Sequence, residues 1–279
     1  MHPYVIVDVF TDVPLEGNPV AVFTEGERVD GELMQRAARE LGLSETVFVL
    51  APGEGADARV RIFTPVAELP FAGHPVLGTA FVVGERLGSE RVRLRTGAGV
   101  IAVALTRDGG EIVSGEMQQP IPTAQSFARG DELLRALGLE RSELPIEAYE
   151  NGPLHVYVAL STEQAVAALA PDMRALAALG PCGFSCFAGA ERRFTTRMFA
   201  PALGVSEDPA TGSAAGPLAV HLCRHGIAAF GDQLEIRQGA QIGRPSLIQA
   251  RVEGSLDRIE RVIVGGSAVV VARGEYLLG

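Results

Sequence analysis

An internal repeat is the feature that most constrains the fold of this chain. Four phrases of the first half recur in the same order in the second half: GNPVAVF from Gly17 and NGPLHVYVAL from Asn151, RIFTP from Arg61 and RMFAP from Arg197, GHPVLGTA from Gly73 and GSAAGPLA from Gly212, and RTGAG from Arg95 and RQGAQ from Arg237. The offset between partners grows slowly, from 134 residues for the first pair to 142 for the last. Such ordered self-similarity predicts two homologous structural halves.

The hydrophobic pattern of each half predicts an α+β fold. Apolar runs or alternation predict strands at residues 4–9, 19–23, 46–50, 59–63, 91–95 and 100–105, and helical patterns occupy residues 31–41 and 75–87. The segments after Gly73 and after Gly212 are apolar on nearly every side, as expected of buried helices. Because the strands lack the alternation with helices that a parallel sheet needs, we expect each half to be a mostly antiparallel sheet barrel around one central buried helix.

We place the division between the halves within a Pro- and Gly-bearing linker around residues 120–130. The expected N-terminal half is residues 1–122, with Glu45 and the Gly73-His74 helix entrance. The expected C-terminal half is residues 123–279, with Asp208 and the Gly212-Ser213 helix entrance. The terminal strand, AVVVARGEYLL, can pack with either half.

Composition removes several functional classes. The formal net charge of the 279 residues is −10 and no Lys/Arg cluster offsets it, which argues against nucleic acid as a partner. We find no signal-like leader and no apolar run long enough for a membrane span, so we expect a soluble, cytoplasmic protein without a membrane partner. Three cysteines, an odd number without a second metal-type pair, argue against a disulfide framework and against zinc, so no metal site is expected.

The two helix entrances are the candidate chemical features. Buried helices that begin at Gly73-His74-Pro75 and at Gly212-Ser213 present free N–H groups and the positive end of the helix dipole, and two such ends in one cleft would hold an anion such as a carboxylate. His74 at a helix start is disfavoured when charged, and a neutral imidazole there suits proton transfer or ligand binding. Ordinary readings stay open: a tight turn at Gly73-His74-Pro75 and an N-cap at Ser213.

The two carboxylates near these entrances are ambiguous from the residues alone. Asp208, before Pro209, is also compatible with an Asx-type turn. Glu45 follows a helix that ends near Gly42 and precedes an apolar strand, where a charged residue is usually just solvated. Periodicity alone does not single out Glu45.

Four segments together resemble a known family over essentially the whole chain. VDVFTDVPLEGNPVAVF, LGLSETVFV, RIFTPVAELPFAGHPVLGTA and EDPATGSAAGPLAVHLCRHG, with GRPSL near the end, closely resemble the phenazine-biosynthesis isomerases of the PhzF family, which has the diaminopimelate epimerase-like fold. The resemblance implies two pseudo-symmetric halves with the active site between them, a homodimer and a cofactor-free reaction. That reaction is the isomerisation of trans-2,3-dihydro-3-hydroxyanthranilate, a small cyclic carboxylate, to the aminoketone precursor of phenazines.

The same resemblance assigns roles to individual residues. Glu45 matches the family's essential acid/base, which shuttles a proton from C3 of the substrate ring to C1. His74 and Asp208 match the residues that hold the substrate amino and hydroxyl groups. Gly73, Gly212 and Ser213 match the substrate-binding contacts of the cleft.

Cysteine positions separate this chain from the amino-acid epimerases of the same fold. Those enzymes are expected to carry one thiolate at each helix entrance, and neither FAGHP nor PATGS contains a cysteine. Two alternatives remain: an isomerase of another cyclic amino acid, and a non-catalytic small-molecule binding protein. The sequence leaves six roles open, those of Cys182, Cys186, Cys223, His155, His221 and His225.

Overall fold

The computed structural model describes residues 1–278. The elements of the first half are β1 (His2–Val9), β2 (Asn18–Phe23), α1 (Gly31–Leu41), β3 (Glu45–Leu50), β4 (Ala58–Phe63), β5 (Glu68–Leu69), α2 (Gly73–Leu87), β6 (Arg91–Thr96), β7 (Gly99–Asp108) and β8 (Glu111–Gln119). Those of the second half are β9 (Thr123–Ser126), α3 (Gly130–Leu137), β10 (Glu147–Glu150), β11 (Leu154–Ala159), α4 (Glu163–Ala167), α5 (Met173–Ala177), β12 (Gly183–Ala190), β13 (Arg193–Ala200), β14 (Val205–Asp208), α6 (Gly212–Arg224), β15 (Leu234–Gln238), β16 (Ser246–Gly254), β17 (Ile259–Gly266) and β18 (Ala268–Tyr276).

Strand pairing repeats between the two halves. In the first half β2 pairs with β3 in parallel, β3 with β4 antiparallel, β4 with β6 in parallel, and β6, β7 and β8 follow antiparallel. The second half has the same pattern, with β11, β12, β13, β15, β16 and β17 in the corresponding places. The mostly antiparallel α+β fold is therefore as the sequence predicts.

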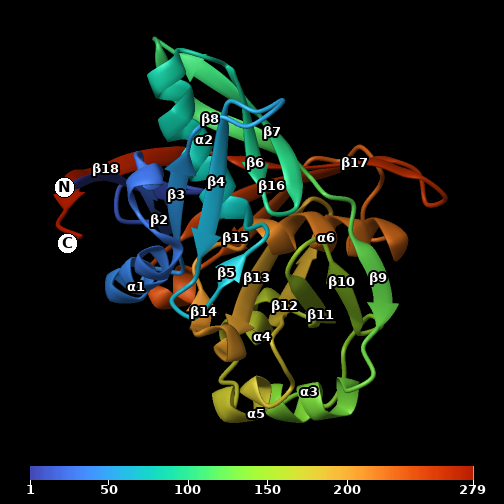
Figure 1. The fold of residues 1–279 in the computed structure, drawn as a ribbon. Helices are drawn as coiled ribbons and strands as arrows, with labels where there is room; N and C mark the ends of the chain where they lie inside the picture. The colour runs from blue at the N-terminus through green and yellow to red at the C-terminus, as the bar shows by residue number, and fades with distance from the viewer. Residues whose placement is uncertain (279) are drawn as a thin grey trace.

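One long helix fills the centre of each sheet (Figure 1). Nearly every residue of α2 from Gly73 to Gly84 is buried, and so is every residue of α6 from Gly212 to Cys223. A helix that is apolar on all sides exposes apolar surface to water unless other elements cover every face. The surrounding strands provide this cover, which explains why these two helices take the central positions.

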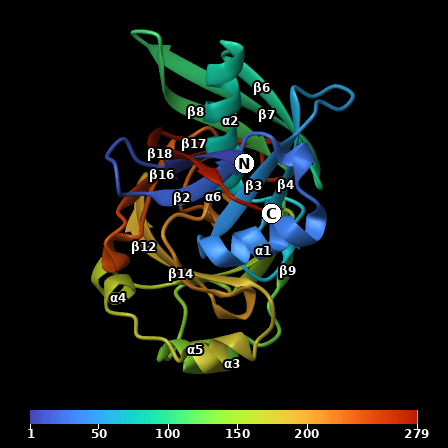
Figure 2. The same cartoon turned by 60° about the vertical axis from the view of Figure 1, so that its left-hand side comes forward.

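Two further strands extend the repeated pattern, and one of them crosses between the halves. Strand β9, which lies within the predicted linker, pairs with β10, and the terminal strand β18 pairs with β1. The two ends of the chain consequently lie close together, with His2 opposite Tyr276 (Figures 1 and 2). Strands β8 and β17 join the two sheets.

The N-termini of α2 and α6 meet without a gap. A Cβ atom added to Gly73 would lie 2.5 Å from the backbone nitrogen of Ser213, and one added to Gly212 would lie 3.1 Å from the backbone nitrogen of His74. Glycine at both positions lets the two helix starts approach to backbone contact.

Among the described residues, no helix is long and apolar enough to cross a membrane.

Candidate active site

A small cavity lies where the two central helices begin. Its volume is about 50 Å³. The six candidate residues predicted from the sequence all line it: Glu45, Gly73, His74, Asp208, Gly212 and Ser213. They come from both halves of the chain, so the structure brings together in one place residues that lie more than a hundred positions apart.

Glu45 and His74 form the first polar pair of the cavity. Glu45 begins β3, His74 is the second residue of α2, and Glu45 Oε2 lies 3.4 Å from His74 Nε2. Only 13% of the Glu45 side chain and 3% of the His74 side chain is exposed. Within residues 1–278, neither of these two facing atoms has a hydrogen-bond partner.

Burial shifts both groups of this pair toward their neutral forms. Desolvation and, to a smaller extent, the nearby Asp208 charge raise the pKa of Glu45 well above its usual value. Desolvation lowers the pKa of His74 to about 3. Both shifts disfavour an ion pair between the two groups and favour proton exchange with a ligand.

Asp208, at the end of β14, is fixed by three side-chain donors. Its Oδ1 accepts hydrogen bonds from Asn18 Nδ2 at 2.9 Å and from Ser44 Oγ at 3.0 Å, and its Oδ2 accepts one from Thr211 Oγ1 at 2.6 Å. Burial raises the pKa of Asp208, while these hydrogen bonds act in the opposite direction. Asn18 Nδ2 also lies 3.2 Å from His74 Nδ1, so it links the two candidate residues.

Within the described chain, no side chain caps the starts of α2 and α6. In α1, α4 and α5 an aspartate or threonine side chain caps the first turn, whereas Ala72 and Thr211 make no side-chain cap to α2 and α6. Uncapped helix starts in a buried site attract an anion, because the N–H groups and the helix dipole both favour negative charge. The cavity is thus suited to a carboxylate.

His155 and Ser213 form a second polar pair of the cavity. His155 Nε2 lies 3.1 Å from Ser213 Oγ, and only 3% of His155 is exposed. Desolvation lowers the pKa of His155 to about 4, so this imidazole is also neutral. The sequence leaves the role of His155 open and does not single out Asn18, although both lie in the repeated phrases.

The three cysteines lie away from this cavity. All are buried free thiols, and burial raises the pKa of each. Cys182 and Cys186 pack in a hydrophobic cluster of the second half that covers α3 to α5, and Cys223 lies near the end of α6. Their placement agrees with the expectation that this chain does not use two thiols as acid and base.

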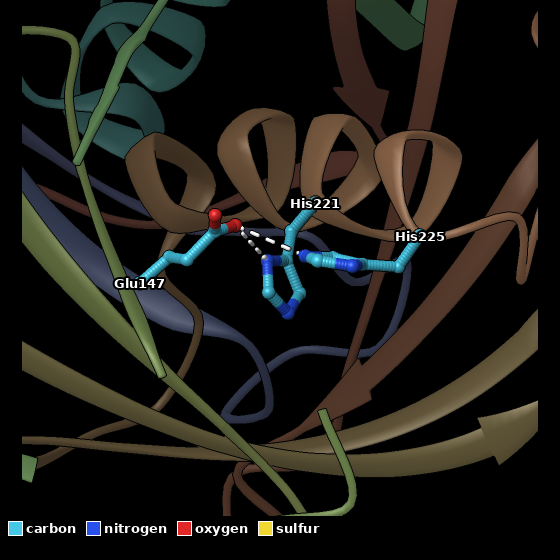
Figure 3. Close-up of side chains that lie close together, drawn as sticks. All are labelled: Glu147, His221 and His225. Atoms are coloured by element: carbon cyan, nitrogen blue, oxygen red, sulfur yellow. Dashed lines mark hydrogen bonds and ion pairs between the residues drawn. The ribbon is translucent and has the colours of Figure 1, made fainter. Parts of the chain in front are cut away.

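A second group of titratable residues surrounds Glu147 near the other end of α6 (Figure 3). Glu147 Oε2 lies 3.1 Å from His221 Nδ1, 3.0 Å from His225 Nε2, and 2.8 Å from Tyr149 Oη, which donates to it. In the described part of the chain, only these histidines and Glu147 are grouped closely enough to hold a metal ion.

The chemistry of this group fits a hydrogen-bonded network better than a metal site. One carboxylate oxygen already lies within hydrogen-bond distance of Tyr149 Oη and of two imidazole nitrogens. The Arg224 guanidinium lies 3.9 Å from the other oxygen, where its charge would repel a cation. A histidine that binds a metal usually donates its second ring N–H to a partner, but His221 Nε2 is buried with none among residues 1–278. We therefore assign His221 and His225 to structural support of the α6 terminus.

Comparisons with known proteins agree with the fold and the motifs. The family model described as "Phenazine biosynthesis-like protein" matches residues 7–274. The curated trans-2,3-dihydro-3-hydroxyanthranilate isomerase of Pseudomonas chlororaphis is 54% identical, and that of Pseudomonas aeruginosa is 53% identical. Both alignments cover 100% of this chain and 100% of the relative.

Solved structures give the same result. The Bacillus anthracis phenazine biosynthesis protein of the PhzF family superposes with a TM-score of 0.86 at 25% identity, covering 99% of each chain. A predicted epimerase from Pseudomonas aeruginosa has a TM-score of 0.84 at 31% identity, covering 100% of each chain. A probable proline racemase from Agrobacterium radiobacter, 13% identical with a TM-score of 0.70 over 100% of this chain and 94% of its own, shares the fold and confirms the epimerase-like architecture.

Proposed function

Because the chain belongs to the phenazine biosynthesis-like PhzF family, we propose that it is a trans-2,3-dihydro-3-hydroxyanthranilate isomerase with its active site between the starts of α2 and α6. The relatives that carry this name cover the whole chain at 53–54% identity. The proposed product is the aminoketone precursor of phenazines.

The proposed reaction moves only protons and double bonds, so it needs no electron acceptor. C3 of the ring loses its hydrogen as a proton, the electrons of that bond shift through the conjugated double bonds, and C1 gains a proton. The enol left at C3 then becomes the ketone, as its hydroxyl loses a proton and C4 gains one. Negative charge develops toward C1 and its carboxylate during this shift, so a site that stabilises a carboxylate lowers the barrier.

We assign the proton transfer to Glu45. A carboxylate that accepts a proton from carbon and returns it to a second carbon works best when its pKa lies near the working pH. Burial raises the pKa of Glu45 in this direction. The uncapped N-termini of α2 and α6 would bind the substrate carboxylate, and His74 and Asp208 would hold the amino and hydroxyl groups.

A single observation carries this proposal: Glu45 Oε2 and His74 Nε2 face one another at 3.4 Å in a buried cavity, and no side chain or backbone group among the described residues satisfies either. Buried polar atoms are normally paired, and exceptions in a native structure call for a ligand or a catalytic role. A substrate that brings an acidic C–H bond and polar substituents into the cavity would satisfy both.

Proton NMR in deuterated water tests the assignment directly. We expect wild-type protein to consume trans-2,3-dihydro-3-hydroxyanthranilate and Glu45→Gln to leave it unchanged, since the amide cannot shuttle a proton. Glu27→Gln, which changes an exposed glutamate in the same way, is the matched control and should react like wild type. Consumption by Glu45→Gln at the wild-type rate would remove Glu45 from the mechanism.

The same experiment decides between the proposed activity and its alternatives. If wild-type protein does not consume this substrate, the assignment fails and a different cyclic amino acid or a non-catalytic binding role replaces it.

We also propose a cytoplasmic homodimer. Family resemblance supports the dimer, and three reduced, buried cysteines are consistent with a reducing compartment. Light scattering of the purified protein measures the dimer mass.

A further inference from the structure

We infer that His155 is a positioning residue for Ser213: its Nε2–H holds the Ser213 hydroxyl oxygen so that the hydroxyl hydrogen is donated to the carboxylate of a bound substrate. This inference rests on the proposed function, which places a cyclic carboxylate in the cavity. It adds a residue that neither the sequence motifs nor the geometry of Glu45 identifies.

In each half, paired strands place one polar side chain beside the start of the central helix. In the first half, Glu45 on β3 pairs with Val20 on β2, and Glu45 faces His74, the second residue of α2. In the second half, the equivalent ladder pairs His155 on β11 with Gly183 on β12, and His155 faces Ser213, the second residue of α6. Each half therefore contributes one strand side chain and one helix-start side chain to the cavity.

Gly183 provides the space that His155 occupies. A Cβ atom at residue 183 would lie 2.7 Å from His155 Nδ1, which is too close for the ring to stay where it is. In the first half the strand residue at the corresponding position is Glu45 itself. The polar side chain is therefore on β3 in the first half and on β11 in the second. The His155 ring lies over Gly183, where β12 has no side chain.

Hydrogen-bond accounting determines the direction of the His155–Ser213 contact. Within residues 1–278, His155 Nδ1 is buried without a partner. If Ser213 donated to Nε2, the ring hydrogen would be on Nδ1, as a buried unpaired N–H, which is rarer and costlier than an unpaired lone pair. The favoured tautomer therefore has the hydrogen on Nε2, which donates to Ser213 Oγ.

This direction leaves the Ser213 hydroxyl hydrogen for the ligand. A serine at a helix start can otherwise rotate to bond nearby backbone groups. With its oxygen held by His155, the hydroxyl joins the free N–H groups of the α6 start as a donor toward negative charge. The low pKa of His155, about 4, keeps the imidazole neutral, so that it orients the hydroxyl without itself competing as a cation for the carboxylate.

Two substitutions separate the donor from the ring. His155→Phe keeps a buried ring but removes the N–H, whereas His155→Gln keeps an N–H donor at a similar reach. A hydrogen bond to a charged group is worth roughly ten- to a hundredfold in affinity. We expect His155→Phe to raise KM by about this factor with a smaller change in kcat, and His155→Gln to recover most of the loss.

A double-mutant cycle with Ser213→Ala tests whether His155 acts through Ser213. We expect His155→Phe to have little further effect on KM in the Ser213→Ala background, because the hydroxyl that it orients is gone. Gly183→Ala, which displaces the His155 ring, should raise KM by part of the His155→Phe effect. This increase should be absent in the Ser213→Ala background. Independent effects of the two substitutions, or equal damage from His155→Phe and His155→Gln, would overturn the inference.

Binding of a simple ligand keeps this test separate from the proposed reaction. Calorimetry with 1-cyclohexene-1-carboxylate measures carboxylate affinity in all variants without turnover, and circular dichroism confirms that each variant is folded. If wild type binds this acid but does not isomerise the substrate, the proposed activity fails and the cycle still decides the role of His155. If wild type binds no cyclic carboxylate and turns over no substrate, the inference fails with the proposed function.

Discussion

Burial of the Glu45 carboxyl sets stability against reactivity at the scale of one residue. Between the usual glutamate pKa of about 4.3 and the raised native value, the folded chain holds a proton on Glu45 that the unfolded chain has lost. Stability from this group therefore falls as pH rises through that window. The environment that prepares the carboxyl to exchange protons also makes its charged form unfavourable in the fold.

Glu45→Gln should consequently stabilise the protein, and more so at higher pH. The glutamine never ionises, so the gain in free energy of unfolding is small near pH 4.5 and grows toward pH 8. Urea unfolding at both values measures it. Glu27→Gln, on the surface, should show no comparable growth. A gain from Glu45→Gln that is the same at both values would show that Glu45 is not held neutral.

Residues differ in how far their sequence context revealed them. His74 could be identified from its position, because a charged histidine at a helix start is unfavourable, and the structure holds it neutral. Glu45 has no such local signal and was identified through family resemblance. The sequence does not predict a role for Asn18, because its partners Asp208 and Ala210 lie about 190 positions away and no local pattern reports such contacts.

At the scale of elements, the contact between the two helix starts depends on glycine. Gly73→Ala would place a methyl group 2.5 Å from backbone atoms of Gly212 and Ser213, which cannot move aside as a flexible side chain can. Overpacking of this kind costs about 1–3 kcal/mol. We expect that loss in thermal or urea unfolding, together with loss of turnover, because the two helix starts must separate.

Gly130→Ala is the matched control for this substitution. Gly130 also begins a helix, α3, but an added Cβ there meets only the end of the Ile146 side chain at 3.4 Å. Alanine favours the helix over glycine, so stability should stay the same or rise slightly. If both alanine variants behave alike, close approach of α2 and α6 is not the reason for glycine at residue 73.

Elements with strong periodicity were predictable and short ones were not. The segments that form α2 and α6 are apolar on nearly every side, and this correctly predicts two buried helices. Helix α2 begins at Gly73, two residues before the predicted helical pattern. Strands β5, β9 and β14 contain two to four residues each, too few for alternation to appear. They form because neighbouring strands supply hydrogen bonds, which is information from the tertiary structure.

At the scale of the whole molecule, the repeat predicted two similar sheets but not how they are joined. The pairings of β9 with β10 and of β18 with β1 join strands that are well separated in the sequence, so no local pattern reports them. The division at residues 122 and 123 stays a prediction. The site lies between elements of both halves, so its shape depends on how they close over it.

The size of the cavity predicts an opening motion. A volume of about 50 Å³ has room for a few water molecules, since each needs about 10–15 Å³, but not for a six-membered ring with three substituents. Substrate entry therefore requires the halves to open. Val66 of the first half is 54% exposed and packs beside Gly204 of the second half, where an added Cβ would lie 3.3 Å from Val66 Cγ1.

Tryptophan fluorescence can follow this motion, because the chain contains no tryptophan of its own. In Val66→Trp, opening of the halves around a ligand should part the indole from the second half, shift its emission to longer wavelength and increase quenching by acrylamide. We expect this change with 1-cyclohexene-1-carboxylate, which does not emit itself. Val113→Trp, on the exposed face of the β7–β8 hairpin, should not respond. Unchanged emission from the Val66→Trp variant, with ligand binding verified by calorimetry, would mean that the ligand enters without movement of the two halves, because opening would alter the contact between residue 66 and Gly204.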